Sequence, residues 1–209
     1  MKLLVITPEI NVPNEIAIVI ELFERGMRRL HLRKKNAGID VYRNYLQQIP
    51  FQFHSLISIH SFPELLKQFP LVGFHCTTEV WKNEEQMKEI QSYQPAVLSA
   101  SFHAWDEIEQ TPYVLNYVFI SPVFDSISKQ GYKASIDRSK LKAIKTRGEQ
   151  LNNQIPAVIA LGGIDAGNIS TLYQEDFDGA AVLGAIWQSQ QPVENFVQMK
   201  ETIERLMNN

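Results

Sequence analysis

Several features are scarce or missing in this 209-residue chain. It contains one cysteine, Cys76, which excludes an intramolecular disulfide and a zinc cluster built from thiolates. No apolar run approaches the roughly 20 residues of a membrane-spanning helix. Charge is nearly balanced, with 20 Lys and Arg against 23 Asp and Glu. These absences argue against a disulfide scaffold, a membrane partner and a nucleic-acid partner.

The start of the chain lacks the features of a targeting segment. Strand-like residues 2–7 stand where a signal peptide would have its longer apolar region and its cleavage site. Together with the lone cysteine, this predicts a cytoplasmic protein. The length suits a single domain covering residues 1–209, and a homo-oligomer stays open as its assembly state.

What the chain does have is a regular series of short apolar runs. They predict eight strands, at residues 3–7, 29–33, 56–60, 71–75, 96–101, 117–121, 157–161 and 179–183. Most segments between them are long enough for one helix, and Phe196, Met199, Ile203 and Leu206 show helical spacing after the last strand. Eight such units predict an α/β fold, a (β/α)8 TIM barrel with all strands parallel. An open doubly wound sheet is the alternative if a strand is wrongly assigned.

Polar side chains gather at the expected C-terminal ends of these strands, where barrel enzymes place their active sites. Four of the five histidines do so, namely His31, His60, His75 and His103. Alternation along the second strand predicts that His31, Arg33 and Lys35 share one face, where the arginine and the lysine would reach one phosphate or diphosphate together. The alternative is a set of hydrogen-bonded histidines beside a solvated basic rim.

The longest connection, residues 121–137, follows the sixth strand and is rich in Ser, Lys and Gly. Its length and lack of periodicity predict a mobile lid over the strand ends. Ser126, Ser128 and Lys129 lie within it and offer two hydroxyl groups and a third cation. A flexible polar loop without a binding role is an equally good interpretation of these three residues alone.

Glycines end the last two predicted strands. Gly162 and Gly163 follow the seventh strand, and Gly184 follows the eighth. In a βα barrel, the loops after these strands form the usual phosphate site, because backbone N–H groups approach the anion closely there. A tight strand-to-helix turn is the alternative. The pairing of the two positions favours a phosphorylated small-molecule ligand.

Other catalytic constellations are missing from the sequence. It has no Gly-x-Ser-x-Gly elbow, Walker loop or His-Glu-x-x-His motif. Alternation places Cys76 on the face of its strand opposite His75, which argues against a cysteine nucleophile. Trp81, Trp105 and Trp187 are expected to pack helices against the barrel.

The order of these motifs resembles the thiamine phosphate synthase family, also called thiamine phosphate pyrophosphorylase, together with the related thiazole tautomerase family. The segments that carry the resemblance are 31–35, 74–76, 101–103, 121–129, 162–164 and 183–186. The most specific is 121–129, which resembles the family's Gly-Pro-hydrophobic-aromatic-Pro-Thr-x-Thr-Lys and retains both hydroxyls and the lysine. The resemblance covers most of the chain.

The resemblance implies a transferase of thiamine biosynthesis that joins hydroxymethylpyrimidine diphosphate to thiazole phosphate and releases diphosphate. Cationic groups would stabilise the departing diphosphate, and the glycines would hold the thiazole's own phosphate. The implied catalytic residues are Arg33, Lys35, Lys129, Ser101 and His103. The implied substrate-binding residues are His31, His75, Ser126, Ser128, Gly162, Gly163, Gly184 and Ala185.

The resemblance also implies Mg²⁺ on the diphosphate, held in the family by one aspartate after the third strand and another after the fourth. This chain has Ile59-His60-Ser61-Phe62 and Thr77-Thr78-Glu79-Val80 at those places. Glu79 is therefore the candidate metal ligand, since a carboxylate oxygen suits Mg²⁺ and an imidazole does not.

Two other functions stay open at this point. A thiazole tautomerase-like isomerase would need a general base, and the family's histidine after the sixth strand is replaced here by Pro122. His103 or His31 would have to take that role. A non-catalytic protein that binds a thiamine phosphate intermediate is the third hypothesis, because the metal-binding aspartates are missing beside the phosphate-binding glycines.

Overall fold

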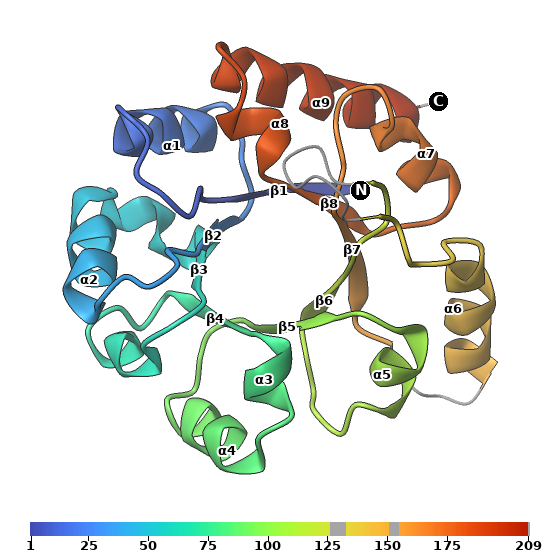
Figure 1. The fold of residues 1–209 in the computed structure, drawn as a ribbon, viewed down its shortest axis with the longest axis horizontal. Helices are drawn as coiled ribbons and strands as arrows, with labels where there is room; N and C mark the ends of the chain where they lie inside the picture. Colours follow the sequence, from blue (N-terminus) through green and yellow to red (C-terminus); the bar gives the residue numbers. More distant parts are fainter. Residues whose placement is uncertain (126–132, 151–154, 209) are drawn as a thin grey trace.

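Eight parallel strands close into a barrel in chain order, with helices around its outside (Figure 1). The computed structural model describes residues 1–125, 133–150 and 155–208. The strands are β1 (Lys2–Ile6), β2 (Leu30–Leu32), β3 (Ile57–Ile59), β4 (Gly73–Cys76), β5 (Leu98–Phe102), β6 (Tyr117–Ile120), β7 (Ala157–Leu161) and β8 (Gly179–Val182). The predicted (β/α)8 barrel is confirmed, and pairing of β8 with β1 excludes the open sheet.

Helical segments connect the strands. The α-helices are α1 (Glu15–Glu24), α2 (Ile39–Gln48), α3 (Thr78–Trp81), α4 (Glu84–Ser92), α5 (Trp105–Gln110), α6 (Lys140–Gln150), α7 (Ile169–Gln174), α8 (Gly184–Trp187) and α9 (Pro192–Met207). Two 3₁₀ helices, η1 (Phe51–Leu56) and η2 (Pro63–Lys67), flank β3. Of its predicted stripe, the last helix buries Phe196, Met199 and Ile203, whereas Leu206 is only partly buried. It packs against α1, α7 and α8, so the end of the chain covers its beginning (Figure 1).

Two apolar layers hold the barrel together. One lies between the strands and the surrounding helices, and the other fills part of the barrel interior with Leu4, Ile6, Phe119, Ile159 and Ala181. Side chains alternate between these layers because successive residues of a strand point to opposite faces. Burial of apolar surface on both faces explains why the strands read as nearly continuous hydrophobic runs.

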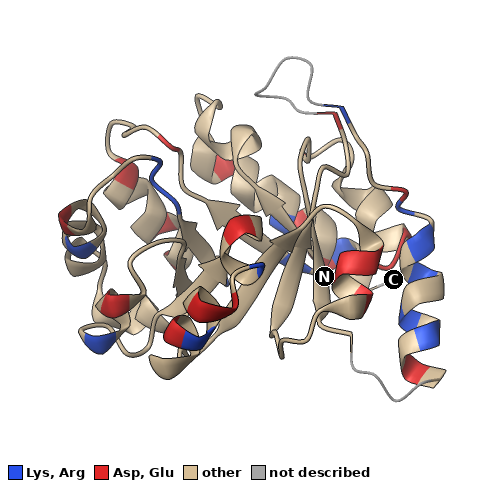
Figure 2. Cartoon of the chain, turned by 60° about the horizontal axis from the view of Figure 1, so that its bottom comes forward, with Lys and Arg blue, Asp and Glu red and all other residues tan. Residues whose placement is uncertain are grey.

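Charged residues lie mainly on the helices and loops, with both signs mixed (Figure 2). Lys2 is the one charged residue in the eight strands that the structure describes. No described helix has the length and apolar character needed to span a membrane.

Candidate active site

A cavity of about 710 Å³ opens at the C-terminal ends of the strands. Residues that follow every one of the eight strands contribute to its wall, as expected for the functional face of a βα barrel. Seven of the residues predicted from the sequence line it, namely Arg33, Glu79, Ser101, His103, Gly162, Gly163 and Gly184. The cavity thus places the arginine after β2 and the glycines after β7 and β8 in one site.

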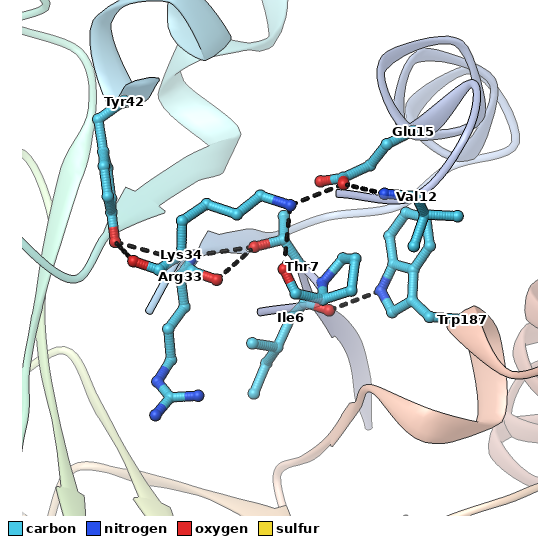
Figure 3. Close-up of polar contacts among 9 residues, drawn as sticks. Ile6, Thr7, Val12, Glu15, Arg33, Lys34, Tyr42 and Trp187 are labelled. Atoms are coloured by element: carbon cyan, nitrogen blue, oxygen red, sulfur yellow. Dashed lines mark hydrogen bonds and ion pairs between the residues drawn. The ribbon is translucent and has the colours of Figure 1, made fainter. Parts of the chain in front are cut away.

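The end of β2 differs from the predicted alternation. The strand stops at Leu32, so the two-residue repeat does not continue through the following residues. Arg33 lines the cavity and pairs with the Glu9 carboxylate, whereas Lys34 points the opposite way toward α1 (Figure 3). Lys35 is exposed and is not among the described residues of the cavity wall. The expectation that Arg33 and Lys35 share one inward face is wrong, because it extends strand geometry past the strand's last residue.

Lys34 fixes the backbone from which Arg33 projects. Its Nζ lies 2.6 Å from Glu15 Oε2 and donates to the Pro8 carbonyl at 3.0 Å. The Thr7 hydroxyl accepts from the Arg33 N–H at 2.9 Å and donates to the Arg33 carbonyl at 3.0 Å (Figure 3). These contacts join the loops after β1 and β2, so Arg33 is held at a defined place on the cavity wall.

The glycines after β7 are required by the neighbouring loop. Gly162 and Gly163 have φ angles of 102° and 65°, a region that favours glycine. A Cβ on Gly163 would overlap the Asp125 carbonyl oxygen and lie 2.8 Å from Phe124 Cβ. The Phe124 N–H also donates to the Gly162 carbonyl at 3.2 Å. Glycine therefore lets the loop after β6 lie directly against the β7 turn, in addition to any contact with a ligand.

Of the two substrate-binding residues predicted in the turn after β8, only one lines the cavity. Gly184 lines the cavity, but Ala185 is not among the described lining residues. The Ala185 carbonyl accepts from Asn195 Nδ2 at 3.1 Å, which ties this turn to α9. The first turn of α8 is thus anchored from behind while its glycine faces the cavity.

His31 and His75 lie beneath the cavity and not in its wall. Both are completely buried, whereas His60 is 8% exposed and borders the cavity. His31 Nδ1 is 2.9 Å from His60 Nε2, and His31 Nε2 is 2.8 Å from Tyr117 Oη. The predicted direct contact of His31 and His75 with substrate is therefore corrected, because the ring nitrogens of both residues already face protein groups.

His75 lies between two serine hydroxyls. Its Nδ1 is 2.8 Å from Ser99 Oγ, and its Nε2 is 2.8 Å from Ser101 Oγ. Burial and, to a smaller extent, the charge of Arg33 together lower the pKa of His75 to about 3. Burial also lowers the pKa values of His31 and His60 well below their usual range, followed by the effect of His75 on each. All three imidazoles are therefore neutral at physiological pH.

His103 presents the second imidazole of the cavity wall. It is exposed, and its Nδ1 lies 2.9 Å from the Ser121 carbonyl oxygen. Since a carbonyl only accepts hydrogen bonds, Nδ1 carries the proton and Nε2 is the basic nitrogen of the neutral ring. The geometry makes His103 a base able to accept a proton through Nε2.

Sequence reasoning missed one wall of the cavity. Glu9, Ile10 and Val12, in the loop after β1, line it, as does Trp187 from α8. Trp187 was expected only to pack a helix, yet its Nε1 also donates to the Ile6 carbonyl at 2.7 Å (Figure 3). Glu9 was detectable, because it is a charged residue two positions beyond the end of a predicted barrel strand. The apolar residues carried no such signal.

Two further predictions have different outcomes. Ser126, Ser128 and Lys129, with the central part of the predicted lid, lie outside the described residues. Cys76 is fully buried, and its burial raises the pKa of the thiol to about 12. The thiol is therefore protonated at neutral pH, in keeping with the expectation that it is no nucleophile.

The residues of the cavity do not fit a Mg²⁺ ion held by the protein. Glu9 is engaged by Arg33. Glu79 is exposed at the start of α3, where its own backbone N–H and then the Thr77 hydroxyl lower the pKa of its carboxyl. Mg²⁺ prefers several hard oxygen ligands, whereas the buried polar cluster that borders the cavity consists of imidazoles and serine hydroxyls.

Known proteins with similar sequences point to one family. A sequence profile described as "Thiamine monophosphate synthase" matches residues 3–186. The chain is 21% identical over 208 residues to a thiamine-phosphate synthase of Lysinibacillus sphaericus, covering 96% of this chain and 93% of that protein. It is 23% identical over 144 residues to the Oceanobacillus iheyensis protein of the same name, covering 68% of this chain and 63% of the relative.

Solved structures agree with the fold. Thiamine phosphate pyrophosphorylase from Bacteroides thetaiotaomicron superposes with a TM-score of 0.72 at 26% identity and covers 98% of both chains. The Pyrococcus furiosus pyrophosphorylase superposes with a TM-score of 0.75 at 22% identity and covers 98% of this chain and 96% of its own.

Proposed function

Because this chain belongs to the thiamine monophosphate synthase family, we propose that it is a transferase of thiamine biosynthesis, which joins hydroxymethylpyrimidine diphosphate to thiazole phosphate and releases diphosphate. The observation that carries the proposal is the shared cavity. Arg33 from the β2 end, Ser101 from the β5 end and the glycines after β7 and β8 all line it. One cavity can therefore bring two phosphorylated ligands together.

The cavity offers a separate region for each of the two phosphorylated substrates. Arg33 offers a planar, permanently charged group for the diphosphate, whose negative charge grows as its bond to the pyrimidine carbon breaks. The backbone at Gly162, Gly163 and Gly184 suits the thiazole phosphate, because chain without a Cβ approaches an anion closely. The thiazole nitrogen would then attack the pyrimidine carbon.

In this proposal, the protein accelerates the reaction mainly by holding the two substrates in position. No nucleophilic side chain is required, since bond breaking creates the electrophile and the second substrate is already in place. Ser126 and Ser128 are proposed to orient the substrates, and Lys129 to share the diphosphate with Arg33. Lys35 is proposed as a more distant cation at the rim, in view of its exposure.

In this structure, the Glu9 carboxylate pairs with the Arg33 guanidinium, the group proposed to bind the diphosphate. A diphosphate that reaches Arg33 competes with the Glu9 carboxylate, and its higher charge and additional oxygens favour the phosphate partner. Glu9 is therefore proposed to release Arg33 when substrate binds.

The direct test is product formation by the purified protein. Incubation with both substrates, with and without added Mg²⁺, is expected to give thiamine phosphate and diphosphate in equal amounts. No product above a blank at micromolar enzyme would reject the transferase proposal. Calorimetric binding of both substrates without turnover would then favour a binding protein.

His103 supports a second candidate function, a thiazole tautomerase-like isomerase. This reaction moves a proton, and His103 presents a basic Nε2 while Nδ1 is held by the Ser121 carbonyl. Turnover of the thiazole phosphate tautomer without pyrimidine diphosphate, lost in His103→Ala and retained in His54→Gln, would support it. Turnover that is unchanged in His103→Ala would exclude this residue as the base.

A further inference from the structure

The barrel interior is polar along one side. Its other side, formed by β6, β7, β8 and β1, carries mainly large apolar groups, as in most barrels of this type. The side formed by β2 to β5 instead carries buried His31, Ser58, His75 and Ser99, with His60 just beyond β3. Polar groups in a barrel interior cost stability unless they are satisfied, and here the histidines hydrogen-bond to one another or to neighbouring hydroxyls within one cluster.

We propose that His31, His60 and His75 bind one divalent transition-metal ion, with Zn²⁺ as the expected occupant. The three side chains each offer a ring nitrogen, and these nitrogens all lie within 4.8 Å of one another. Imidazole is a preferred ligand of Zn²⁺ and its neighbours in the first transition series, and a poor ligand of Mg²⁺. The site is thus different in donor chemistry from any Mg²⁺ on substrate phosphate, and it does not depend on the proposed transferase activity.

The distances are close to those that an ion requires. His31 Nδ1 and His60 Nε2 are 2.9 Å apart. Two nitrogens on one tetrahedral Zn²⁺, with bonds of about 2.0–2.1 Å, lie about 3.3 Å apart. To share one ion, the two nitrogens would have to move apart by a few tenths of an ångström, and the proton between them would move to the other nitrogen of the same ring.

The ring orientations define the movement that binding needs. The His31 ring is edge-on to both partners, at 83° to each. The His60 and His75 rings stack at 4.3 Å with 28° between their planes, so they must tilt toward each other for their nitrogens to converge. His60 has room to tilt because it borders the cavity.

The surrounding groups suit metal-bound imidazoles. A metal ligand must be neutral, and burial keeps all three rings neutral. Histidine ligands usually hydrogen-bond through their second nitrogen, which fixes ring orientation and tautomer. Tyr117 Oη beside His31 Nε2 provides this contact. His75 has a serine hydroxyl at each ring nitrogen, so one of Ser99 and Ser101 would keep its hydrogen bond and the other would release the nitrogen that binds the ion.

The cluster also lies beside the cavity, so a bound ion would be accessible to a small molecule in the cavity. His60 and Ser101 both border the cavity, so a fourth coordination position is directed toward it. Three protein ligands with one open position is the arrangement of catalytic zinc sites. The described cluster has no carboxylate, and the nearby Arg33 charge is offset by Glu9. A hydroxide or a phosphate oxygen would therefore complete the shell and balance the charge.

Titration of the chelator-treated protein with Co²⁺ tests the proposal, because Co²⁺ on histidine nitrogens has a visible spectrum that depends on its coordination. We expect one Co²⁺ per chain, with the spectrum of a four- or five-coordinate ion, and its displacement by Zn²⁺. His31→Gln and His60→Asn should each weaken binding by more than the roughly 10–100-fold that loss of an outer hydrogen-bond partner costs. Tyr117→Phe should weaken Co²⁺ binding only within that roughly 10–100-fold range and should still bind one Co²⁺ per chain.

His103→Asn is the matched control, because it removes a histidine of the same cavity that lies outside the cluster. It should bind Co²⁺ as the unaltered protein does. If a cluster variant fails to fold, X-ray absorption of the Zn²⁺-loaded unaltered protein tests the same ligand set. Three imidazoles are expected around the ion. Absence of binding at equimolar metal, unchanged binding in folded His31→Gln, or a shell without imidazole would overturn the proposal.

Discussion

Lys34 and Glu15 form an ion pair that is almost completely removed from solvent, with Nζ 2.6 Å from Oε2 and side-chain exposures of 3% and 6%. Glu15→Gln keeps the shape but leaves the Lys34 charge without its partner. We expect a loss of about 3–5 kcal/mol in the free energy of unfolding, measured by urea denaturation. Glu21→Gln, which breaks the exposed pair with Arg25, should cost less than about 1 kcal/mol. Equal losses in the two variants would contradict a stabilising role of the buried Lys34–Glu15 pair.

Gly163→Ala should disturb the contact between the β7 turn and the loop after β6. The added Cβ would meet Asp125 and Phe124 in a backbone conformation that alanine rarely adopts. We expect a loss of about 1–3 kcal/mol in unfolding free energy. Gly38→Ala is the control, because a Cβ there meets nothing within 4 Å, and its cost should be below about 1 kcal/mol. A Gly163→Ala protein as stable as Gly38→Ala would show that the loop does not require glycine.

Arg33→Ala should reduce turnover much more than stability. Loss of one charged donor to the leaving diphosphate is expected to lower kcat by about 10²–10³-fold. Melting temperature should change little, because the side chain is 38% exposed. Arg33→Lys should recover only part of the rate, since lysine cannot form the bidentate contact. Arg25→Ala, at an exposed site directly after α1, controls for loss of positive charge. A large drop in melting temperature with full turnover would refute the assigned role.

Lys129→Ala should behave like Arg33→Ala if both cations hold the diphosphate. We expect a fall in kcat of similar size and little change in the unfolding midpoint. The double variant should lose less than the product of the two single effects, because the residues act on one leaving group. Full additivity in steady-state kinetics would indicate that the two residues act on separate groups.

Cys76 should report on opening of the barrel. Its thiol is fully buried, and its Sγ lies 3.6 Å from Met87 Sδ. A thiol reagent should therefore leave the folded protein unlabelled over minutes and label one thiol per chain in denaturant. Mass spectrometry distinguishes the two outcomes. Rapid labelling of the folded protein would show that β4 is more accessible than the structure indicates.

The strands could be predicted because both faces of each strand are buried. Apolar runs such as residues 157–161 have the length of a strand and are followed by glycine, so the parallel barrel could be derived from pattern alone. The arginine and the glycines of the cavity followed from the rule that barrel sites lie at strand ends. That rule needs only the order of elements along the chain.

Details that depend on register and on distant partners could not be predicted. β2 has only three residues, so alternation gave the wrong direction for Lys35, and the burial of Lys34 depends on Glu15 from another element. Histidines at three adjacent strands could have suggested a cluster. Their convergence, however, depends on how far each strand extends along the barrel axis, which a single sequence does not specify.

Crystals soaked with diphosphate and thiazole phosphate test the central claim most directly. The account predicts both anions in one cavity, with diphosphate on Arg33 in place of Glu9 and the thiazole phosphate on the backbone at Gly162, Gly163 and Gly184. Electron density for either ligand at the opposite end of the barrel, with this cavity unoccupied at saturating concentrations, would contradict it.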